Sequence, residues 1–287
     1  MDRIFQIGDF VFRLCCPAEI TPPENFMKFE CESESFEYTY QINVSDTLPD
    51  PEGKVIAQRP DLAVFRCETE AGESLECRLI GVKGNPEYYA CYQEVSENCA
   101  EVTLIWERIA ELHIDPIFTS LLALERRLVK RNSMILHCAY VEYQGEAILF
   151  SAPSETGKTT QANLWEKYRG SRTVNGDRSL LGKIDGRWNA QGWPVCGTSE
   201  VCNNEALPVK AVVMLSQAKE NKAEKLTPGH AFPLLYSQIT VNKWNREDHI
   251  HTMDLIEDFL GSVPVIHLEC TISEEAVICL EEILQTL

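Results

Sequence analysis

The stretch Ala147-Ile-Leu-Phe-Ser-Ala-Pro-Ser-Glu-Thr-Gly-Lys-Thr-Thr160 decides how the second half of this chain is expected to fold. It begins with an apolar run typical of a buried strand, passes through a turn-forming segment, and leads into a helix predicted over residues 158–167. Inside it, Ala152-x-x-x-x-Gly157-Lys158-Thr159 matches a relaxed phosphate-loop pattern, with alanine at the first glycine position. Because such a loop directs backbone N–H groups and a helix N-terminus at bound phosphate, the sequence predicts a polyphosphate-binding loop.

The loop carries side chains suited to ATP and Mg²⁺. Lys158 is expected to neutralise the β- and γ-phosphates, and the Thr159 hydroxyl is expected to hold Mg²⁺. A turn that only looks like a phosphate loop is the alternative, but the strand and helix flanks favour phosphate binding. The residues expected to bind the nucleotide are Ser154, Glu155, Thr156, Gly157, Lys158, Thr159 and Thr160.

Two further polar residues are expected near the loop. Asp177 stands far enough after the loop for the chain to cross one helix and return on a neighbouring strand. A carboxylate at that strand end is suited to ligating Mg²⁺ or to accepting a proton from an attacking hydroxyl. His137 lies on the strand that precedes the loop strand by one hairpin. The alternative for Asp177 is a structural role in a turn, and the alternative for His137 is a structural role in the core. Together with Lys158, the functional interpretation is favoured for Asp177, whereas the two interpretations of His137 are equally supported.

Several segments together resemble a known family. Leu136-His137-Cys138-Ala139, residues 148–160 and Asn175-Gly176-Asp177-Arg178 are similar to the nucleotide-binding core of HPr kinase/phosphorylase and of ATP-dependent phosphoenolpyruvate carboxykinase. Gly192-Trp-Pro-Val-Cys-Gly197 resembles the Gly-Thr-Pro-Trp-x-Gly loop of small bacterial HPr-kinase-related proteins, and Leu207-Pro-Val-Lys-Ala211 extends the likeness. The resemblance covers roughly residues 133–287 and implies a P-loop fold distinct from the doubly wound NTPases.

The resemblance implies a role for each matching residue. It implies that Lys158 clamps phosphate and that Thr159 and Asp177 bind the metal. It further implies that Asp177 activates the acceptor hydroxyl and that His137 lies near the transferred phosphoryl group. Arg178 would offset charge on the phosphoryl oxygens. The expected catalytic residues are thus Asp177, Lys158, His137 and Arg178.

Three departures from the family pattern bear on activity more than on fold. Glu155 stands where the family usually has glycine, so its carboxylate either repels the triphosphate or points into solvent. The family has two consecutive aspartates where this chain has only Asp177. The usual tryptophan of the Gly-Thr-Pro-Trp loop is replaced by Val195, with Trp193 two residues earlier.

The pattern along the chain predicts a mixed α+β and α/β protein in three stretches. Residues 1–98 are expected to form a β-rich module, with strands over residues 4–15, 36–44, 62–68 and 75–82. Residues 99–132 are expected to form a helical bridge of two amphipathic helices interrupted at Asp115-Pro116. Residues 133–287 are expected to carry the P-loop core, with a hairpin turn at Asp185-Gly186 and a helix starting at Thr252.

Composition excludes several classes of protein. The chain has 44 acidic and 26 basic residues and a formal charge of -18, which disfavours a nucleic-acid partner. The densest basic cluster, Arg126-Arg127 with Lys130-Arg131, is expected to be a solvated helix face. No apolar run approaches the ~20 residues that span a bilayer, so no membrane partner is expected. His249-Ile-His251 would place two imidazoles on one face of a strand, but a surface loop is preferred to a metal site.

The cysteines and the N-terminus point to a cytoplasmic protein. The chain has 12 cysteines, too few for a disulfide scaffold of its length, and no Cys-x-x-Cys pair suited to structural zinc. Its first residues lack the basic start and apolar stretch of a signal peptide, so reduced thiols are expected.

Two functions remain open. The first is an ATP- and Mg²⁺-dependent kinase that phosphorylates a serine or threonine of a small protein or ribosomally made peptide, an acceptor class that the resemblance implies. The second is a catalytically weak or inactive nucleotide-binding module that binds a peptide or protein partner. Carboxykinase activity is disfavoured because those enzymes are nearly twice as long. The sequence leaves the oligomeric state open.

Overall fold

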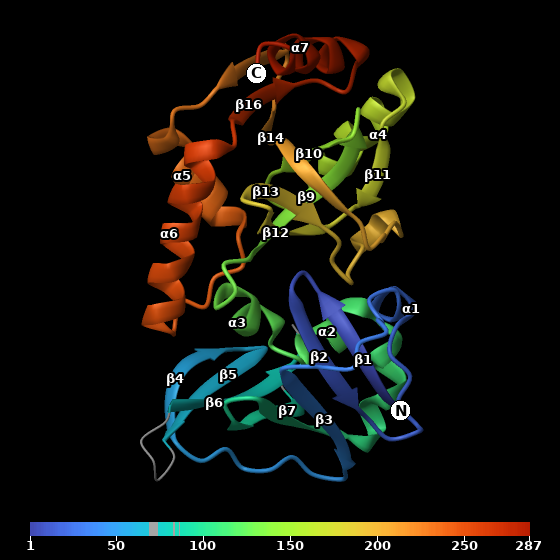
Figure 1. Ribbon diagram of the computed structural model, residues 1–287, viewed down its shortest axis with the longest axis vertical. Helices are drawn as coiled ribbons and strands as arrows, with labels where there is room; N and C mark the ends of the chain where they lie inside the picture. Colours follow the sequence, from blue (N-terminus) through green and yellow to red (C-terminus); the bar gives the residue numbers. More distant parts are fainter. Residues whose placement is uncertain (69–73, 83, 86) are drawn as a thin grey trace. The chain divides into compact units, whose positions relative to one another are not determined.

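Residues 1–68, 74–82, 84–85 and 87–287 are described by the computed structural model of the chain. Two large mixed sheets with flanking helices make it a mixed α/β protein, as the sequence predicts at that level (Figure 1). The chain divides into two compact units, Met1–Arg127 and Leu128–Leu287. Within the described ranges, no helix is both long enough and apolar enough to cross a membrane.

An eight-stranded sheet, in the order β1-β2-β3-β8-β7-β6-β5-β4, forms the first unit. Its strands are β1 (Asp2–Ile7), β2 (Phe10–Cys15), β3 (Tyr38–Ser45), β4 (Lys54–Arg59), β5 (Leu62–Glu68), β6 (Ser74–Gly81), β7 (Tyr88–Ser96) and β8 (Cys99–Ile105). Strand β3 pairs in parallel with β2 and with β8, and the other neighbours pair antiparallel. The helices of this unit are α1 (Glu24–Met27), the 3₁₀ helix η1 (Trp106–His113) and α2 (Asp115–Ser120).

The first hairpin corrects one prediction. The sequence predicts a single strand over residues 4–15, but the chain reverses at Gly8 between β1 and β2. Gly8 has a φ of +64°, a left-handed conformation that glycine adopts without strain. The reversal sets Phe5 opposite Phe12, with ring centroids 5.9 Å apart, and Phe26 of α1 lies 4.9 Å from Phe5. These buried rings form part of the core of the first unit.

Residues 99–132 differ from the two helices predicted for them. Residues 99–105 form strand β8, which pairs with β3 and β7. Its buried positions alternate with more exposed ones because successive side chains of a strand point to opposite faces of the sheet. The break predicted at Asp115-Pro116 is the start of α2. Helix α3 (Leu124–Val129) then crosses the boundary between the two units.

Arg126 and Arg127 correct a further prediction, because both side chains are buried rather than solvated. Both guanidinium groups bind Glu94, with Arg126 Nε 2.5 Å from Glu94 Oε1. Burial alone would raise the pKa of Glu94, but the hydrogen bond from Arg126 and the charges of both arginines outweigh it and hold that pKa below its usual value. A second buried pair, Arg78 with Glu76, adjoins this one, since Arg126 Nη1 lies 3.5 Å from Glu76.

Replacing Glu94 tests this buried charge cluster. Glu94→Ala removes the carboxylate that both buried guanidinium groups bind, so we expect the free energy of unfolding of the first unit to fall by about 3–5 kcal/mol. Urea denaturation measures the loss. The control is Glu101→Ala, an exposed position on β8, for which we expect a change within about 0.5 kcal/mol. Equal effects of the two substitutions would contradict the assignment.

A second sheet, in the order β10-β9-β12-β13-β14-β16-β15 with β11 paired to β9, forms the second unit. Its strands are β9 (Met134–Tyr143), β10 (Glu146–Ser151), β11 (Arg172–Asn175), β12 (Arg178–Ile184), β13 (Arg187–Gln191), β14 (Ala206–Gln217), β15 (Lys222–Lys225) and β16 (Val265–Cys270). Because β10 pairs with β14 as well as β9, strands β9, β10, β12, β13 and β14 form a closed ring of pairings. Strands β10, β14 and β16 run parallel, so their carboxyl ends lie at one edge.

Helices cover both faces of this sheet (Figure 1). The helices of the unit are α4 (Lys158–Arg169), the 3₁₀ helix η2 (Gly197–Ser199), α5 (Pro228–Gln238), α6 (Arg246–Ser262) and α7 (Glu274–Leu284). Alternate side chains of β9 face two different cores. Leu136 and Cys138 share a core with α5 and α6, whereas Ala139 and Val141 share one with α4 and α7. Burial of both faces fixes which residues of β9 point to each side.

Two local predictions for this unit have different outcomes. Asp185-Gly186 joins β12 to β13 with positive φ at both residues, so the predicted hairpin is confirmed. The helix predicted to start at Thr252 starts at Arg246, because the Asn245 side chain caps it by accepting hydrogen bonds from two backbone N–H groups of its first turn. His249-Ile-His251 therefore lies within α6, neither on a strand nor in a loop.

Candidate functional site

The predicted strand, loop and helix are present in the second unit. Strand β10 ends at Ser151, residues 152–157 form the loop, and α4 begins at Lys158. Gly157 precedes the helix with a φ of +118°, a conformation that excludes a side chain on backbone grounds. Its missing Cβ also leaves space, since among the described residues the nearest atom to an added Cβ is Thr160 Cβ at 4.0 Å. The loop can therefore present its backbone to a ligand at the start of α4.

Lys158 is held inside the loop. Its side chain is buried, and its Nζ donates hydrogen bonds to the carbonyl oxygens of Ala152 at 3.0 Å and Pro153 at 3.3 Å. Burial lowers the pKa of Lys158, and the negative charge of Asp177 partly offsets that effect. The loop thus positions a cation before any ligand binds.

Asp177 lies in the turn between β11 and β12. The Asn175 side-chain oxygen accepts hydrogen bonds from the backbone N–H of Asp177 at 2.9 Å and of Arg178 at 3.0 Å, which fixes the turn. Arg178 Nε donates to Asp177 Oδ2 at 2.9 Å. Asn175 is not among the residues expected at the site, although asparagine before Gly-Asp is a known signal for this kind of turn.

His137 faces this turn from β9. It pairs with Arg178 in the sheet, and its Nε2 lies 3.7 Å from Asp177 Oδ1. Burial lowers the pKa of His137, and the nearby cations Lys158 and Arg178 lower it further, while Asp177 opposes them. The imidazole is therefore held in its neutral form near pH 7.

The segment that resembles the Gly-Thr-Pro-Trp loop lies directly against the Asp177 turn. A Cβ added to Gly176 would overlap the Ser199 side chain, and one added to Gly197 would lie 3.1 Å from Asp177 Cβ. Gly197 also has a φ of +60°. Asn175 Nδ2 donates to the carbonyl oxygen of Trp193 at 2.8 Å and ties the two segments together. Close approach of two backbones explains both glycines.

Glu155 adopts a backbone conformation that favours glycine. Its φ is +65°, which costs a residue with a Cβ about 1–2 kcal/mol. The side chain is exposed, in line with the expectation of a carboxylate that reaches solvent. The negative charge of Glu155 still lies on the loop that would bind phosphate.

The structure brings together four of the predicted residues, Lys158, Asp177, His137 and Arg178. The residues predicted to bind the nucleotide, on the loop and the first turn of α4, differ in exposure. Ser154 and Glu155 are exposed, whereas Thr156, Thr159 and Thr160 are half-buried. The described residues show no hydrogen bond between the Thr159 hydroxyl and Asp177.

A magnesium site here would depend on its ligand for most of its coordination. In the described part of the chain, no three His, Cys, Asp or Glu side chains gather closely enough to hold a metal ion. Mg²⁺ commonly binds through one or two carboxylates together with substrate phosphates and water. Asp177 and Thr159 fit that pattern as the protein ligands of a metal that arrives with a polyphosphate.

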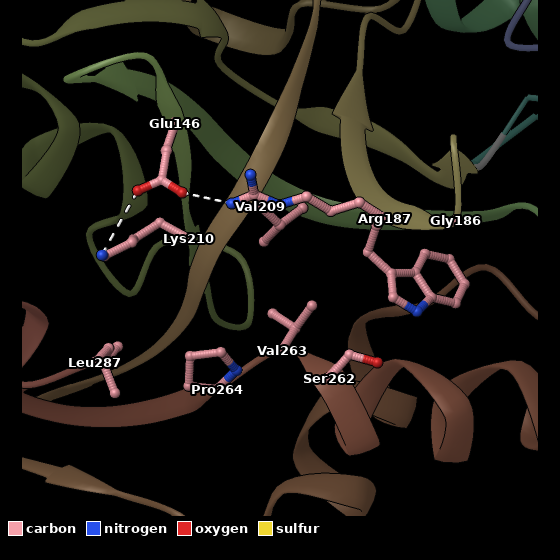
Figure 2. A pocket seen from close by; sticks show the side chains of 10 residues that line it. Glu146, Gly186, Arg187, Val209, Lys210, Ser262, Val263, Pro264 and Leu287 are labelled. Atoms are coloured by element: carbon pink, nitrogen blue, oxygen red, sulfur yellow. Dashed lines mark hydrogen bonds and ion pairs between the residues drawn. The ribbon is translucent and has the colours of Figure 1, made fainter.

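Two pockets lie at opposite ends of the parallel strands. A groove of about 600 Å³ adjoins the loop and the carboxyl ends of β14 and β16. A smaller pocket of about 370 Å³ lies where these strands begin (Figure 2). There Glu146 forms ion pairs with Arg187 at 2.6 Å and with Lys210 at 3.5 Å. The charged side chains of this pocket therefore pair with one another. Ligands of parallel sheets bind outside the carboxyl ends, which favours the groove beside the loop.

Fold and site together define a two-unit mixed α/β protein whose second sheet carries a strand, loop and helix at residues 146–169. The family model of the SynChlorMet cassette protein ScmC matches residues 107–273, which is more than half of the chain. The protein belongs to this ScmC family, which is a different family from the HPr kinase/phosphorylase that the sequence resembles.

A solved structure shows a weak similarity to this chain. The solved structure of the HPr(Ser) kinase/phosphatase from Coxiella burnetii is 11% identical, with a TM-score of 0.32, over 53% of this chain and 88% of that one. A likeness at that level supports no inference about fold or activity. No curated protein matches the chain.

The neutral state of His137 predicts how stability depends on pH. Below its ordinary pKa of 6.5, histidine takes up a proton in the unfolded chain before it does so in the folded protein. The unfolded state then binds more protons, so stability should fall as pH drops below about 6.5, by at most about 1.4 kcal/mol for each pH unit of the pKa difference. The stability of His137→Gln should fall less over the same range.

Urea denaturation at several pH values, in buffer with a metal chelator, measures this difference. Carboxylates that titrate in both proteins cancel when the two curves are subtracted. Identical pH dependence of the two proteins would show that the folded protein does not hold His137 neutral.

Proposed function

We propose that this protein is an ATP- and Mg²⁺-dependent kinase that transfers the γ-phosphoryl group to a serine or threonine hydroxyl of a small protein or peptide. The observation that carries the proposal is the convergence of Lys158, Asp177 and His137 at the carboxyl edge of the sheet, beside a loop whose backbone is open to a ligand. The acceptor class rests on the sequence resemblance described above.

The binding step falls to the loop and Lys158. Loop N–H groups and the first turn of α4 can bind phosphate oxygens, and the helix dipole favours their charge. Lys158 already lies in the loop, where its Nζ donates to two neutral acceptors, Ala152 O and Pro153 O. A phosphate can replace these neutral carbonyls with a charge-assisted hydrogen bond, which is stronger.

The transfer step falls to Asp177 and its neighbours. Asp177 can accept the proton of an acceptor hydroxyl, since Asn175 and Arg178 fix the position of its turn and its carboxylate. Arg178 and Lys158 supply positive charge for the phosphoryl oxygens, and neutral His137 can hydrogen-bond to the acceptor or to an oxygen. Mg²⁺ held by Asp177 and Thr159 would neutralise the phosphates. Phosphoryl transfer requires little beyond such positioning and charge compensation.

The second candidate function is a nucleotide-binding module without turnover. Glu155 favours it, because an exposed carboxylate in a left-handed conformation replaces the glycine of a phosphate loop. A single acid in place of two also leaves metal binding and proton transfer to the same group. These features oppose tight ATP binding and fast transfer respectively.

Two substitutions separate these functions. Lys158→Ala should weaken ATP binding at least about tenfold, because it removes a charge-assisted contact. Asp177→Asn should retain ATP binding measured without Mg²⁺, and it should lower the rate of ADP release with Mg²⁺ at least about 100-fold, because it removes the proton acceptor and a metal ligand. Isothermal titration measures ATP binding. An ADP-coupled assay in buffer with Mg²⁺ measures transfer, with serine- or threonine-containing peptides as acceptors. Peptides and proteins encoded in the same cassette are the first acceptors to try.

Exposed residues give matched controls. Lys167→Ala at the end of α4 and Asp185→Asn in the β12–β13 hairpin should leave both quantities unchanged. Lys158-dependent ATP binding with no ADP release for any acceptor would favour the module. Absence of ATP binding in the unaltered protein would refute both functions.

Glu155 tests the electrostatics of the loop. Glu155→Gly removes a negative charge beside the phosphates and also the left-handed strain, so ATP should bind about fivefold more tightly. Glu155→Gln removes the charge but keeps the Cβ. A gain shared by both variants identifies charge as the cause, and a gain confined to glycine identifies the backbone. Unchanged affinity in both would remove the electrostatic argument.

A further inference from the structure

A groove beside the loop is formed where three parallel strands end. Residues 155–157 follow β10, Gln217 and Ala218 lie at the end of β14, and residues 270–272 lie at the end of β16. Thr160 and Gln161 of α4 complete the lining, and the volume is about 600 Å³. Small-molecule pockets commonly have volumes in this range, and the carboxyl ends of parallel strands are where such sheets bind ligands.

The groove adjoins the loop from one set of strands, and the residues proposed for phosphoryl transfer adjoin it from another. His137 lies on β9, and the Asp177 turn leads into β12, which pairs with β9. The groove lies toward β14 and β16, on the other side of β10 from β9 in the pairing order. A ligand can therefore hold its phosphates in the loop and extend into the groove without obstructing the acceptor.

Gln161 supplies the observation that points to a ligand. Its side chain is only 2% exposed, and its Nε2 donates to Cys270 Sγ at 3.2 Å and to the carbonyl oxygen of Thr271 at 3.3 Å. Its Oε1 is buried and has no hydrogen-bond partner among the described residues. Turning the amide over would lose the bond to the Thr271 carbonyl and set two acceptor oxygens against each other, which favours the orientation that leaves Oε1 unpaired. A buried acceptor left in this state is costly, and a donor on a ligand would satisfy it.

Ile272 adds an apolar surface to the same groove. Its side chain is 79% exposed, more than any other large apolar side chain in the described part of the chain. At the rim of a groove that already has a buried polar acceptor, such a side chain can pack against a flat ring.

We propose that this groove binds the nucleoside of the nucleotide whose phosphates the loop takes. Gln161 Oε1 is covered in the unliganded chain, so the side chain turns toward the groove to accept a hydrogen bond from an O–H or N–H donor of that nucleoside, and Ile272 packs against its base. The proposal rests on the proposed function, since it extends the same nucleotide from the loop into the groove. Three donors have this chemistry: the 2′- and 3′-hydroxyls of the ribose and the exocyclic amino group of the base.

Comparing ATP with inorganic tripolyphosphate, both with Mg²⁺, tests the proposal on the full chain. The loop contributes to the binding of both, but the groove contributes only to ATP. ATP should therefore bind at least about tenfold more tightly than tripolyphosphate. Gln161→Leu should weaken ATP binding about fivefold and leave tripolyphosphate binding unchanged.

Three nucleotide analogues identify the donor. 2′-Deoxy-ATP and 3′-deoxy-ATP each lack one ribose hydroxyl, and ITP has an oxygen in place of the adenine amino group. The analogue that lacks the donor should bind the unaltered protein about fivefold more weakly than ATP, and this difference should vanish in Gln161→Leu. If all three analogues match ATP in the unaltered protein, the role of Gln161 is refuted.

A second variant covers the case in which Gln161→Leu disturbs α4. Ile272→Ser changes an exposed side chain, so folding should be preserved while ATP, and not tripolyphosphate, binds more weakly. Ile250→Ser, an exposed position on α6, is the matched control and should alter neither affinity. Equal affinity for ATP and tripolyphosphate would overturn the nucleoside groove while leaving the phosphate loop intact. Binding of neither compound would overturn the proposed function and this inference together.

Discussion

The antiparallel register of β9 against β10 and β12 is the constraint on which the candidate site depends. It sets Cys138 opposite Ser151, the last residue before the loop, and His137 opposite Arg178, the first residue after the Asp177 turn. A slip of one residue would move His137 to the other face of the sheet. The ring of pairings through β14 opposes such a slip, because a change at one pair would have to be matched by every other strand.

Features of the fold that depend on local sequence could be predicted, and those that depend on distant partners could not. The strand, loop and helix around residues 147–160 and the Asp185-Gly186 hairpin follow from short-range turn and periodicity rules. The helix predicted in place of strand β8 is wrong because one of the two pairing partners of that strand, β3, is remote in sequence. The solvated face predicted for Arg126-Arg127 is wrong because the carboxylates that bind it come from other strands.

The candidate site shows the same division. Lys158 and Asp177 could be proposed from motif and spacing, and the structure holds them in one charge cluster. Asn175 has a local signal, since its side chain caps the turn immediately after it. Gln161 has none, because its unpaired oxygen becomes apparent only when the end of β16 is placed beside α4. One buried amide thus carries information that a motif search omits.

The buried arginines also limit how the protein can be divided. Arg126 and Arg127 are the last residues of the first unit, yet they neutralise carboxylates in its interior. They lie on α3, which continues into the second unit. A fragment that ends before this helix would leave Glu94 without the two arginines that pair with it. A fragment that ends after Arg127 would divide the helix itself. Recombination or truncation that treats the two units as interchangeable modules therefore has no clean crossover point at their border.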